Sequence, residues 1–390
     1  MVKGIIEGNC LVLFLAGKID SSNAIETEEQ IRAEIDARPG LPWLLDARDL
    51  NYISSAGLRI LLELKQAAKA RIRVRNVSPQ IFETLSITGF TQLLDVQKRL
   101  RSISVEGCPE IGRGAIGTVY RLDADTIVKV YEIPDCLPMI ENEQKRAKQA
   151  FIRGIPTAIS YDVVKVGDRY GSVFEMVRAE NCNDIIAKDP ARTDEIVDLY
   201  VSLLKRVHSV EMLPGELPDA RGVYAGYLND VAGYLPEGIA DRIRALIADM
   251  PEDLHAVHGD VQMKNVMLSE REALLIDMET LSVGNPVFDF AGLWMAYCAF
   301  LEDEPDNSRR FLGIDAEACL GVYQKVVSRY FGEDESLPEK QDRIQVLGAV
   351  RFLYVLTVLH LGNPELTELR IRHTRERLEE LLPRVDRLCV

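Results

Sequence analysis

Residues 258–290 read HGDVQMKNVMLSEREALLIDMETLSVGNPVFDF, and the rest of the chain is interpreted from this stretch. Three residues with oxygen-bearing side chains stand out in it, namely Asp260, Asn265 and Asp277. Oxygen ligands of this kind suit a hard cation such as Mg²⁺ together with a phosphate. A lone HGD, or a lone Asp at the end of a strand, more often belongs to an ordinary turn than to a functional site. Only the combination of these residues, with its spacing, indicates a site.

Two short apolar runs, residues 266–268 and 273–276, surround a polar turn of four residues. This pattern predicts a β-hairpin. If the inner ends of the two runs pair, Asn265 lies opposite Ile276 and therefore beside Asp277. The HGD segment lies on the loop that enters the hairpin, so the oxygen-bearing side chains converge at its open end.

The stretch resembles the catalytic region of the aminoglycoside and choline phosphotransferases, which share the protein-kinase-like fold. The family pattern is HGDxxxxN, then an apolar strand that ends in Asp, and then GxPxxDxA. The resemblance implies that Asp260 orients or deprotonates the acceptor hydroxyl and that Asn265 and Asp277 hold Mg²⁺. The chain supplies the whole pattern in order: His258, Gly259, Asp260, Asn265, Asp277, Gly284, Pro286, Asp289 and Ala291.

Two departures from the serine/threonine kinases of eukaryotic type favour the branch that acts on small molecules. Those kinases usually place a lysine two residues after the catalytic Asp, where this chain has Gln262. The resemblance lets Lys264, four residues after that Asp, meet the γ-phosphate instead. Gly259 stands where those kinases have an arginine that reads a phosphorylated activation loop.

Residues 111–120 read IGRGAIGTVY. The glycine pattern of a dinucleotide site opens a helix, but here the following TVY is β-branched and aromatic and favours a strand. If the chain turns at residues 123–125, Lys129 lies opposite Val119 and beneath the glycines. A glycine-rich hairpin with a lysine on the next strand is the kinase arrangement. The resemblance therefore implies that ATP is bound by Lys129 and by the three glycines of the pattern, Gly112, Gly114 and Gly117.

The next helix is predicted over residues 138–152, beginning with a proline that suits a first turn. Glu143 shares a face with the apolar Ile140, whereas Glu141 lies beside lysines on the solvent side. A carboxylate on an inward face needs a partner. We therefore choose Glu143 to pair with Lys129, and a surface glutamate on a misjudged helix is the alternative.

Strands are predicted over residues 159–166 and 170–177. In the resemblance, Glu175 and Val177 fall at the hinge between two lobes, where main-chain groups bind adenine. Helices are expected first at 193–208 and then, from about residue 290 onward where the pattern is almost entirely helical, at 341–361 and 365–382. His208, at the end of the first of these, is expected to be a structural histidine.

The first 105 residues alternate short apolar strands with helices, which indicates an α/β layer with crossover connections. The order of elements, with Asp46 and the sequence YISSAGL at residues 52–58, resembles the STAS domain of anti-sigma-factor antagonists and sulfate transporters. In the bacterial antagonists the serine that opens the helix, which matches Ser55 here, is reversibly phosphorylated. Strands are expected at 10–16, 43–47 and 71–74, and helices at 22–37, 57–70 and 79–85.

The serine pair departs from the antagonist pattern. Ser54 stands where the best-known antagonists carry Asp, and Ala56 where they often carry Ser or Thr. The partner, and whether Ser55 is phosphorylated, therefore stay open. Simple N-capping of the next helix is the alternative role for the two serines.

The composition is that of an ordinary globular protein. A formal charge of −15 with no basic block argues against nucleic-acid binding. Seven scattered cysteines without a CxxC pair favour reduced thiols in a cytoplasmic protein, and no signal peptide or membrane-spanning segment is expected. The histidines lack the spacing of a metal site.

The predicted architecture is an α/β STAS domain with a mixed sheet over residues 1–105, followed by an α+β bilobal kinase-like domain over 106–390. The N-lobe spans about 106–180, and the C-lobe, about 181–390, is largely helical. The expected cofactors are ATP and Mg²⁺, and the expected partners are a small hydroxylated substrate and a protein bound at the STAS domain. A homo-oligomer is left open.

Three functions remain in competition at this point. The first is an ATP-dependent phosphotransferase that acts on a small hydroxylated molecule and is regulated by the STAS domain. The second is a protein serine kinase whose target is a STAS serine, in a bacterial partner-switching system. The third is a non-catalytic nucleotide-binding scaffold, against which the joint presence of Lys129, Asp260, Asn265 and Asp277 argues. Labelling of protein by ATP separates the first two.

Overall fold

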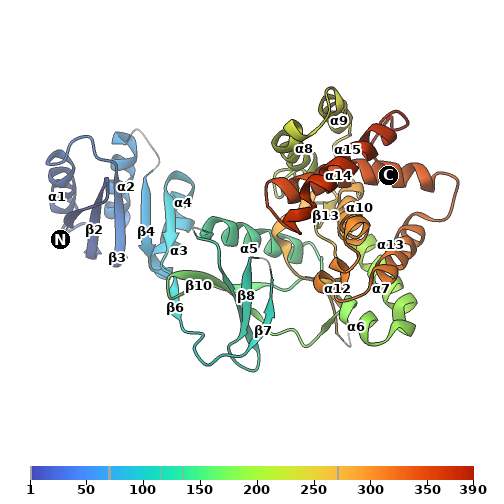
Figure 1. Cartoon of the computed structure of the whole chain (residues 1–390). Coiled ribbons are helices and arrows are strands. Elements are labelled where there is room, and N and C mark those ends of the chain that lie inside the picture. The colour runs from blue at the N-terminus through green and yellow to red at the C-terminus, as the bar shows by residue number, and fades with distance from the viewer. Residues whose placement is uncertain (1, 69–71, 115, 135, 270–271) are drawn as a thin grey trace. The chain divides into compact units, whose positions relative to one another are not determined.

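The computed structural model describes residues 2–68, 72–114, 116–134, 136–269 and 272–390. The chain divides into two compact units, Met1–Ser104 and Val105–Val390, each with its own hydrophobic core (Figure 1). Parts of the predictions lie outside the described residues: the last residues of the helix expected at 57–70, the first of the strand expected at 71–74, position 115 of the glycine pattern, and positions 270–271 of the hairpin turn.

The first unit contains a mixed sheet in the order β1-β2-β3-β4-β5, in which β1 and β2 are antiparallel and the later pairs parallel. This confirms the predicted fold class. The strand expected at 43–47 is longer, because its pairing with β2 continues to Ile53. The strands are β1 (Val2–Glu7), β2 (Cys10–Ile19), β3 (Trp43–Ile53), β4 (Arg73–Val77) and β5 (Asp95–Lys98), and β6 (Arg101–Ile103) follows them. The helices are α1 (Ala24–Asp36), α2 (Ser55–Ala67), α3 (Pro79–Ile87) and α4 (Phe90–Leu93).

Two adjacent serines lie at the start of helix α2 and have different roles. Ser54 is the N-cap residue, and its hydroxyl accepts a hydrogen bond from Ala56 N–H at 3.2 Å. Ser55 is the first helical residue and is exposed. Gly57 is needed for close packing here, because a Cβ would lie 2.6 Å from the Ile53 side chain. The capping role therefore belongs to Ser54.

The second unit begins with an antiparallel sheet whose strands run in the order β10-β11-β9-β8-β7. Val119 pairs with Lys129, so the predicted register is confirmed. The strands are β7 (Glu110–Arg113), β8 (Gly117–Arg121), β9 (Thr126–Tyr131), β10 (Ser160–Val166) and β11 (Arg169–Glu175), and the helix that follows β9 is α5 (Leu137–Ile152).

The hairpin predicted from residues 266–276 is present. Leu268 pairs with Ala273, and the Ile276 N–H donates to the Asn265 carbonyl at 3.0 Å, which confirms the predicted register. Two short strand pairs complete this part of the unit. The strands are β12 (Glu180–Asn181), which pairs with β14 (Val266–Leu268); β15 (Ala273–Leu275); and β13 (Ala256–Val257), which pairs with β16 (Ser282–Val283).

The rest of the second unit is helical, as expected. The helix predicted at 341–361 ends earlier, at Thr357, because His360 and Gly362 adopt positive φ angles of 53° and 99°. No helix in the described ranges is long and apolar enough to cross a bilayer. The α-helices are α6 (Cys182–Lys188), α7 (Thr193–His208), α8 (Ala220–Val231), α9 (Ile239–Ala248), α10 (Val287–Trp294), α11 (Phe300–Asp303), α12 (Asn307–Phe311), α13 (Ala316–Phe331), α14 (Leu337–Thr357) and α15 (Thr367–Leu381). The 3₁₀ and π segments are η1 (Pro190–Arg192), η2 (Ala232–Tyr234), η3 (Met263–Asn265), η4 (Met278–Thr280), η5 (Met295–Ala299) and η6 (Pro364–Leu366).

The three glycines of the β7–β8 hairpin differ in what the fold requires of them. A Cβ on Gly117 would lie 2.4 Å from the Val130 carbonyl oxygen, so the sheet itself excludes a side chain there. A Cβ on Gly114 would have no neighbour closer than 3.8 Å, and the same holds for Gly112. Packing therefore accounts for Gly117 and leaves the other two glycines free for a ligand that approaches the backbone.

We expect Gly117→Ala to destabilise this sheet by about 1–3 kcal/mol, because the added methyl group overpacks a backbone contact. Gly114→Ala is the matched control and should change stability by less than about 0.5 kcal/mol. Urea unfolding of the full chain, together with hydrogen exchange of the β8 and β9 amides, measures both effects. Equal stability of the two variants would contradict the packing argument.

Candidate active site

The carboxylate of Asp260 is held by side chains of its own loop. Its Oδ1 accepts a hydrogen bond from Gln262 Nε2 at 2.8 Å, and its Oδ2 accepts one from Asn265 Nδ2 at 3.0 Å. The same Asn265 amide also donates to the Asp260 carbonyl at 2.9 Å. Arg351 Nη2 also lies 3.6 Å from Asp260 Oδ1. Asp260 and Asn265, which the sequence predicted to converge, therefore lie together.

His258 connects this loop to the hairpin. Its Nδ1 accepts a hydrogen bond from Asp260 N–H at 3.2 Å, and its Nε2 lies 3.1 Å from the Ile276 carbonyl. This pattern requires the proton on Nε2, which then donates to that carbonyl. Because Ile276 precedes Asp277, this one fully buried ring links the Asp260 loop to the end of the hairpin that leads into Asp277.

Asp289 binds the main chain of the loop that carries Asp260. It is fully buried and accepts hydrogen bonds from His258 N–H at 3.0 Å, from Gly259 N–H, and from His208 Nε2 at 2.9 Å. Burial opposes ionisation of the Asp289 carboxyl. The hydrogen bond from His208 and its electrostatic attraction outweigh the effect of burial, so the pKa of Asp289 is lowered. His208, whose Nδ1 lies 2.7 Å from the Tyr330 hydroxyl, therefore has a structural place as expected.

Lys129 lies between two carboxylates. Its Nζ is 3.0 Å from Asp277 Oδ1 and 3.8 Å from Glu143 Oε1. Glu143 is buried on the inner face of α5, where the Tyr131 hydroxyl donates to its Oε2 at 2.8 Å. Asp277 has a φ of 64°, a left-handed conformation that costs a non-glycine residue energy and often marks a functional site.

The charges of this cluster influence one another. Burial disfavours the ammonium of Lys129, but Asp277 and Glu143 outweigh it and raise the pKa of Lys129. Burial raises the pKa of Glu143, and the attraction of Lys129 opposes that rise. The cluster keeps its lysine charged and leaves an excess of carboxylate around it.

Two residues of this cluster were missed in the sequence. Glu279 follows Asp277 by two positions, and burial, then the charges of Asp277 and Glu143, raise its pKa. Arg146 donates from Nη1 to the Glu279 carbonyl, which ties α5 to η4. The inward position of Arg146 could have been predicted from the sequence, because Arg146 follows Glu143 by three positions and so lies on the same helix face.

The donor atoms fit a cation only together with a ligand. Among the described residues, no three His, Cys, Asp or Glu side chains come together as a metal site. Magnesium is usually held by one or two protein carboxylates while phosphates and water complete its shell. Asn265 and Asp277 offer such an incomplete set.

The remaining predicted residues lie at the edges of the site. Lys264 Nζ lies 3.2 Å from the centre of the Phe311 ring. Glu175 ends β11, and its carboxylate accepts from the Tyr161 hydroxyl at 3.2 Å. The next residue, Met176, donates from its N–H to the Asp125 carbonyl at 2.8 Å, so Val177 directly follows the point where the sheet ends.

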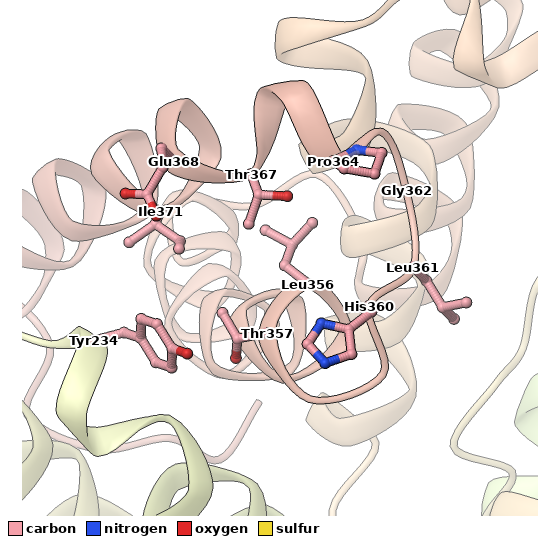
Figure 2. A pocket seen from close by; sticks show the side chains of 10 residues that line it. All are labelled: Tyr234, Leu356, Thr357, His360, Leu361, Gly362, Pro364, Thr367, Glu368 and Ile371. Atoms are coloured by element: carbon pink, nitrogen blue, oxygen red, sulfur yellow. The ribbon is translucent and has the colours of Figure 1, made fainter.

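A cavity of about 170 Å³ lies elsewhere in the second unit, between η2, the end of α14 and the start of α15 (Figure 2). Its wall includes Tyr234, Thr357, His360 and Glu368, and none of the predicted site residues lines it. A much smaller hollow adjoins Gly259 and is lined in part by Tyr224, Tyr227, Thr280 and Arg351. Only the second of these hollows touches the loop that carries Asp260.

Two families match the sequence. The one described as "Phosphotransferase enzyme family" matches residues 107–318, and the one described as "Mlab, STAS domain" matches residues 5–95. The chain is also 32% identical over 90 residues to BtrV of Bordetella bronchiseptica, a protein that carries the name of an anti-sigma factor antagonist. That match covers 22% of this chain and 76% of BtrV.

Among solved structures, the aminoglycoside phosphotransferase APH(4)-Ia is similar, with a TM-score of 0.50 and 12% identity over 77% of this chain and 98% of that one. A thermostable variant of that enzyme, in a ternary complex with AMP-PNP and hygromycin B, has the same score and identity over 71% of this chain and 93% of that one. At this identity the likeness shows a shared fold.

We expect the Lys264 amine to titrate at about pH 8, because burial lowers its pKa to about 8 against the opposing charges of Asp260 and Asp277. The unfolded lysine stays charged up to about pH 10.4, so between these values the unfolded chain binds the extra proton and this group's contribution to stability rises with pH. An NMR titration of carbon-labelled lysines measures the midpoint, with Lys264→Arg to assign the signal. A midpoint near the unfolded value would contradict the burial argument.

Proposed function

The chain belongs to the phosphotransferase enzyme family and carries an N-terminal STAS domain, and from this premise we propose that it transfers the γ-phosphate of ATP to a hydroxyl group of a small molecule. The observation that supports the proposal most is the meeting of Lys129 with Asp277 beside the loop of Asp260 and Asn265. The N-lobe, about residues 106–180, would hold the nucleotide, and the C-lobe, about 181–390, would hold the acceptor.

The nucleotide would lie under the β7–β8 hairpin. Gly112 and Gly114 leave its backbone open, since no side-chain or backbone atom would lie within 3.4 Å of an added Cβ. Lys129, kept charged by its two carboxylates, would bind the α- and β-phosphates. Backbone groups around Glu175 and Val177 would bind adenine where β11 ends.

Asn265 and Asp277 would hold the magnesium ion, whose chemical contribution is to neutralise charge on the phosphates. Lys264 would leave the ring of Phe311 and bind the γ-phosphate. Asp260 would accept the proton of the acceptor hydroxyl while the acceptor oxygen replaces the bridging oxygen of ADP on the γ-phosphorus. Such catalysis is mostly positioning and charge neutralisation.

The solved relatives are named as aminoglycoside phosphotransferases, and one was solved with hygromycin B. We carry over from them only the class of acceptor, a hydroxylated small molecule. A screen of such molecules coupled to ADP release identifies the acceptor.

The STAS unit supports a second candidate function, phosphorylation of a STAS serine. Ser55 is exposed at the first turn of α2, while Ser54 supplies the cap. A phosphate at this place meets free N–H groups and the positive end of the helix dipole. The likeness to BtrV adds to the case for a protein partner at this unit. Incubation with labelled ATP separates a labelled protein from a labelled small molecule.

We expect Asp277→Ala to abolish metal-dependent nucleotide binding or turnover, because the triphosphate charge loses a metal-binding oxygen. Asp260→Asn should keep ATP affinity and lower transfer by about 10²–10⁴-fold, because an amide cannot accept the hydroxyl proton. Calorimetric ATP titration and ADP release measure the two quantities. Normal ADP release by Asp277→Ala would refute the metal role, and loss of ATP binding by Asp260→Asn would make Asp260 a ligand.

We expect Ser55, rather than Ser54, to be the phosphoacceptor of the STAS unit, and Ser55→Asp to weaken a protein partnership, since phosphate adds nearly two negative charges to an interface fitted to a hydroxyl. Mass spectrometry of the protein from its native cells, and after incubation with ATP, locates the phosphate. Ser54→Ala is the control, which should cost about 1 kcal/mol as a lost cap and leave phosphorylation in place. Phosphate elsewhere with none on Ser55 would contradict this assignment.

A further inference from the structure

We propose that Arg351 of α14 is a positioning residue for phosphotransfer, because its buried guanidinium binds the Gly259 carbonyl and the Asp260 carboxylate and so fixes the direction in which Asp260 faces the acceptor. The inference rests on the proposed function. Arg351 lies beyond residues 107–318, the part of the chain that the phosphotransferase family matches. The family pattern therefore assigns it no role.

The contacts of Arg351 are directed at one loop. Its Nη1 donates to the Gly259 carbonyl, and its Nη2 lies 3.6 Å from Asp260 Oδ1. The side chain is 10% exposed, and the Asp260 side chain is 23% exposed. One face of the Asp260 carboxylate is thus turned to Arg351 inside the protein while another remains open to an acceptor.

Charge explains why the pair stays together. A buried guanidinium is costly unless an anion or several acceptors compensate it. Burial disfavours the charged form of Arg351, yet Tyr224 and Asp260 outweigh it and raise the pKa of Arg351. Asp260 is the carboxylate among these influences, and its attraction contributes to keeping the buried guanidinium charged.

Two glycines allow α10 and α14 to approach closely enough for the Arg351 guanidinium to reach the loop. A Cβ on Gly292 of α10 would lie 2.7 Å from Arg351 Nη1 and 3.1 Å from the Gly259 carbonyl oxygen. A Cβ on Gly348 of α14 would lie 2.4 Å from the Trp294 ring and 3.2 Å from the Ala291 carbonyl. The close approach of α10 and α14 therefore depends on these glycines, and it brings a residue of α14 to the Asp260 loop.

Aromatic rings support Arg351 on its other side. Tyr224 and Tyr227 of α8 line the same small hollow as Arg351 and Gly259. Tyr227 stacks on Tyr354, with ring centres 4.1 Å apart, and Tyr354 follows Arg351 by three positions on the same helix face. Helix α8 thereby holds the turn of α14 from which the guanidinium reaches the loop.

The test compares full-length Arg351→Met with Arg343→Met, using ATP with Mg²⁺ and water as the acceptor, and measures ADP release. Arg343 is the matched control: it is a buried arginine of the same helix, but it binds the Cys389 carbonyl and Glu339. We expect Arg351→Met to lower kcat by about 10–100-fold, the effect of a misplaced catalytic group, while the KM for ATP changes less than about threefold. Arg343→Met should keep the kcat of the natural protein.

Two further variants guard against a simple folding defect. Arg351→Lys keeps the charge but cannot bind both oxygens in one plane, so its kcat should lie between those of the natural protein and Arg351→Met. In Arg351→Ala, added methylguanidinium should restore part of kcat, whereas ammonium should not. The inference is overturned if Arg351→Met and Arg351→Lys both turn over within threefold of the natural protein, if Arg343→Met loses as much, or if methylguanidinium restores nothing. Absence of ADP release from the natural protein would instead refute the proposed function, and the inference with it.

Discussion

One buried carboxylate holds the loop on which the candidate site is built. Asp289 accepts hydrogen bonds from the main chain of His258 and Gly259 and from the His208 ring. Each hydrogen bond to a charged group contributes about 1.5–3 kcal/mol, so these bonds together are a large fraction of the stability of a domain. His258 then carries the constraint to Asp260 and, through the Ile276 carbonyl, to the hairpin. The geometry of the site thus depends on a residue that is itself out of reach of any substrate.

The ion cluster around Lys129 is built differently, because it is left incomplete. Asp277, Glu143 and Glu279 lie around Lys129, and burial, together with repulsion between the carboxylates, raises the pKa of both Glu143 and Glu279. Such an excess of carboxylate is unfavourable in a half-buried place unless further positive charge arrives. The magnesium ion of the proposed nucleotide complex would supply that charge, whereas the Asp289 network has its partners within the chain.

Within each unit, residues that are close in sequence have different roles. Ser54 caps α2, while Ser55 is exposed at its first turn. In the second unit, Gly117 is required by the sheet, while Gly114 is open. The start of the helix in the first case, and packing within the sheet in the second, decide which residue the fold uses and which remains available to a ligand or a modifying enzyme.

Features that follow from local periodicity could be predicted from the residues alone. The registers that place Lys129 opposite Val119 and Asn265 opposite Ile276 follow from short turns, and the choice of Glu143 as the inward glutamate of its helix follows from helical spacing. Helix ends were less certain, because the positive φ angle of His360 has no strong sequence signal.

Contacts between residues far apart in the chain could be read only from the folded structure. Arg351 reaches Gly259 across 92 positions, and His208 reaches Asp289 across 81. The ring of Phe311 covers Lys264 for the same reason, since both are brought together by helix packing. No periodicity encodes such pairs, because they depend on how closely whole helices approach. For Arg351 the close approach of α10 and α14 depends on the missing side chains of Gly292 and Gly348.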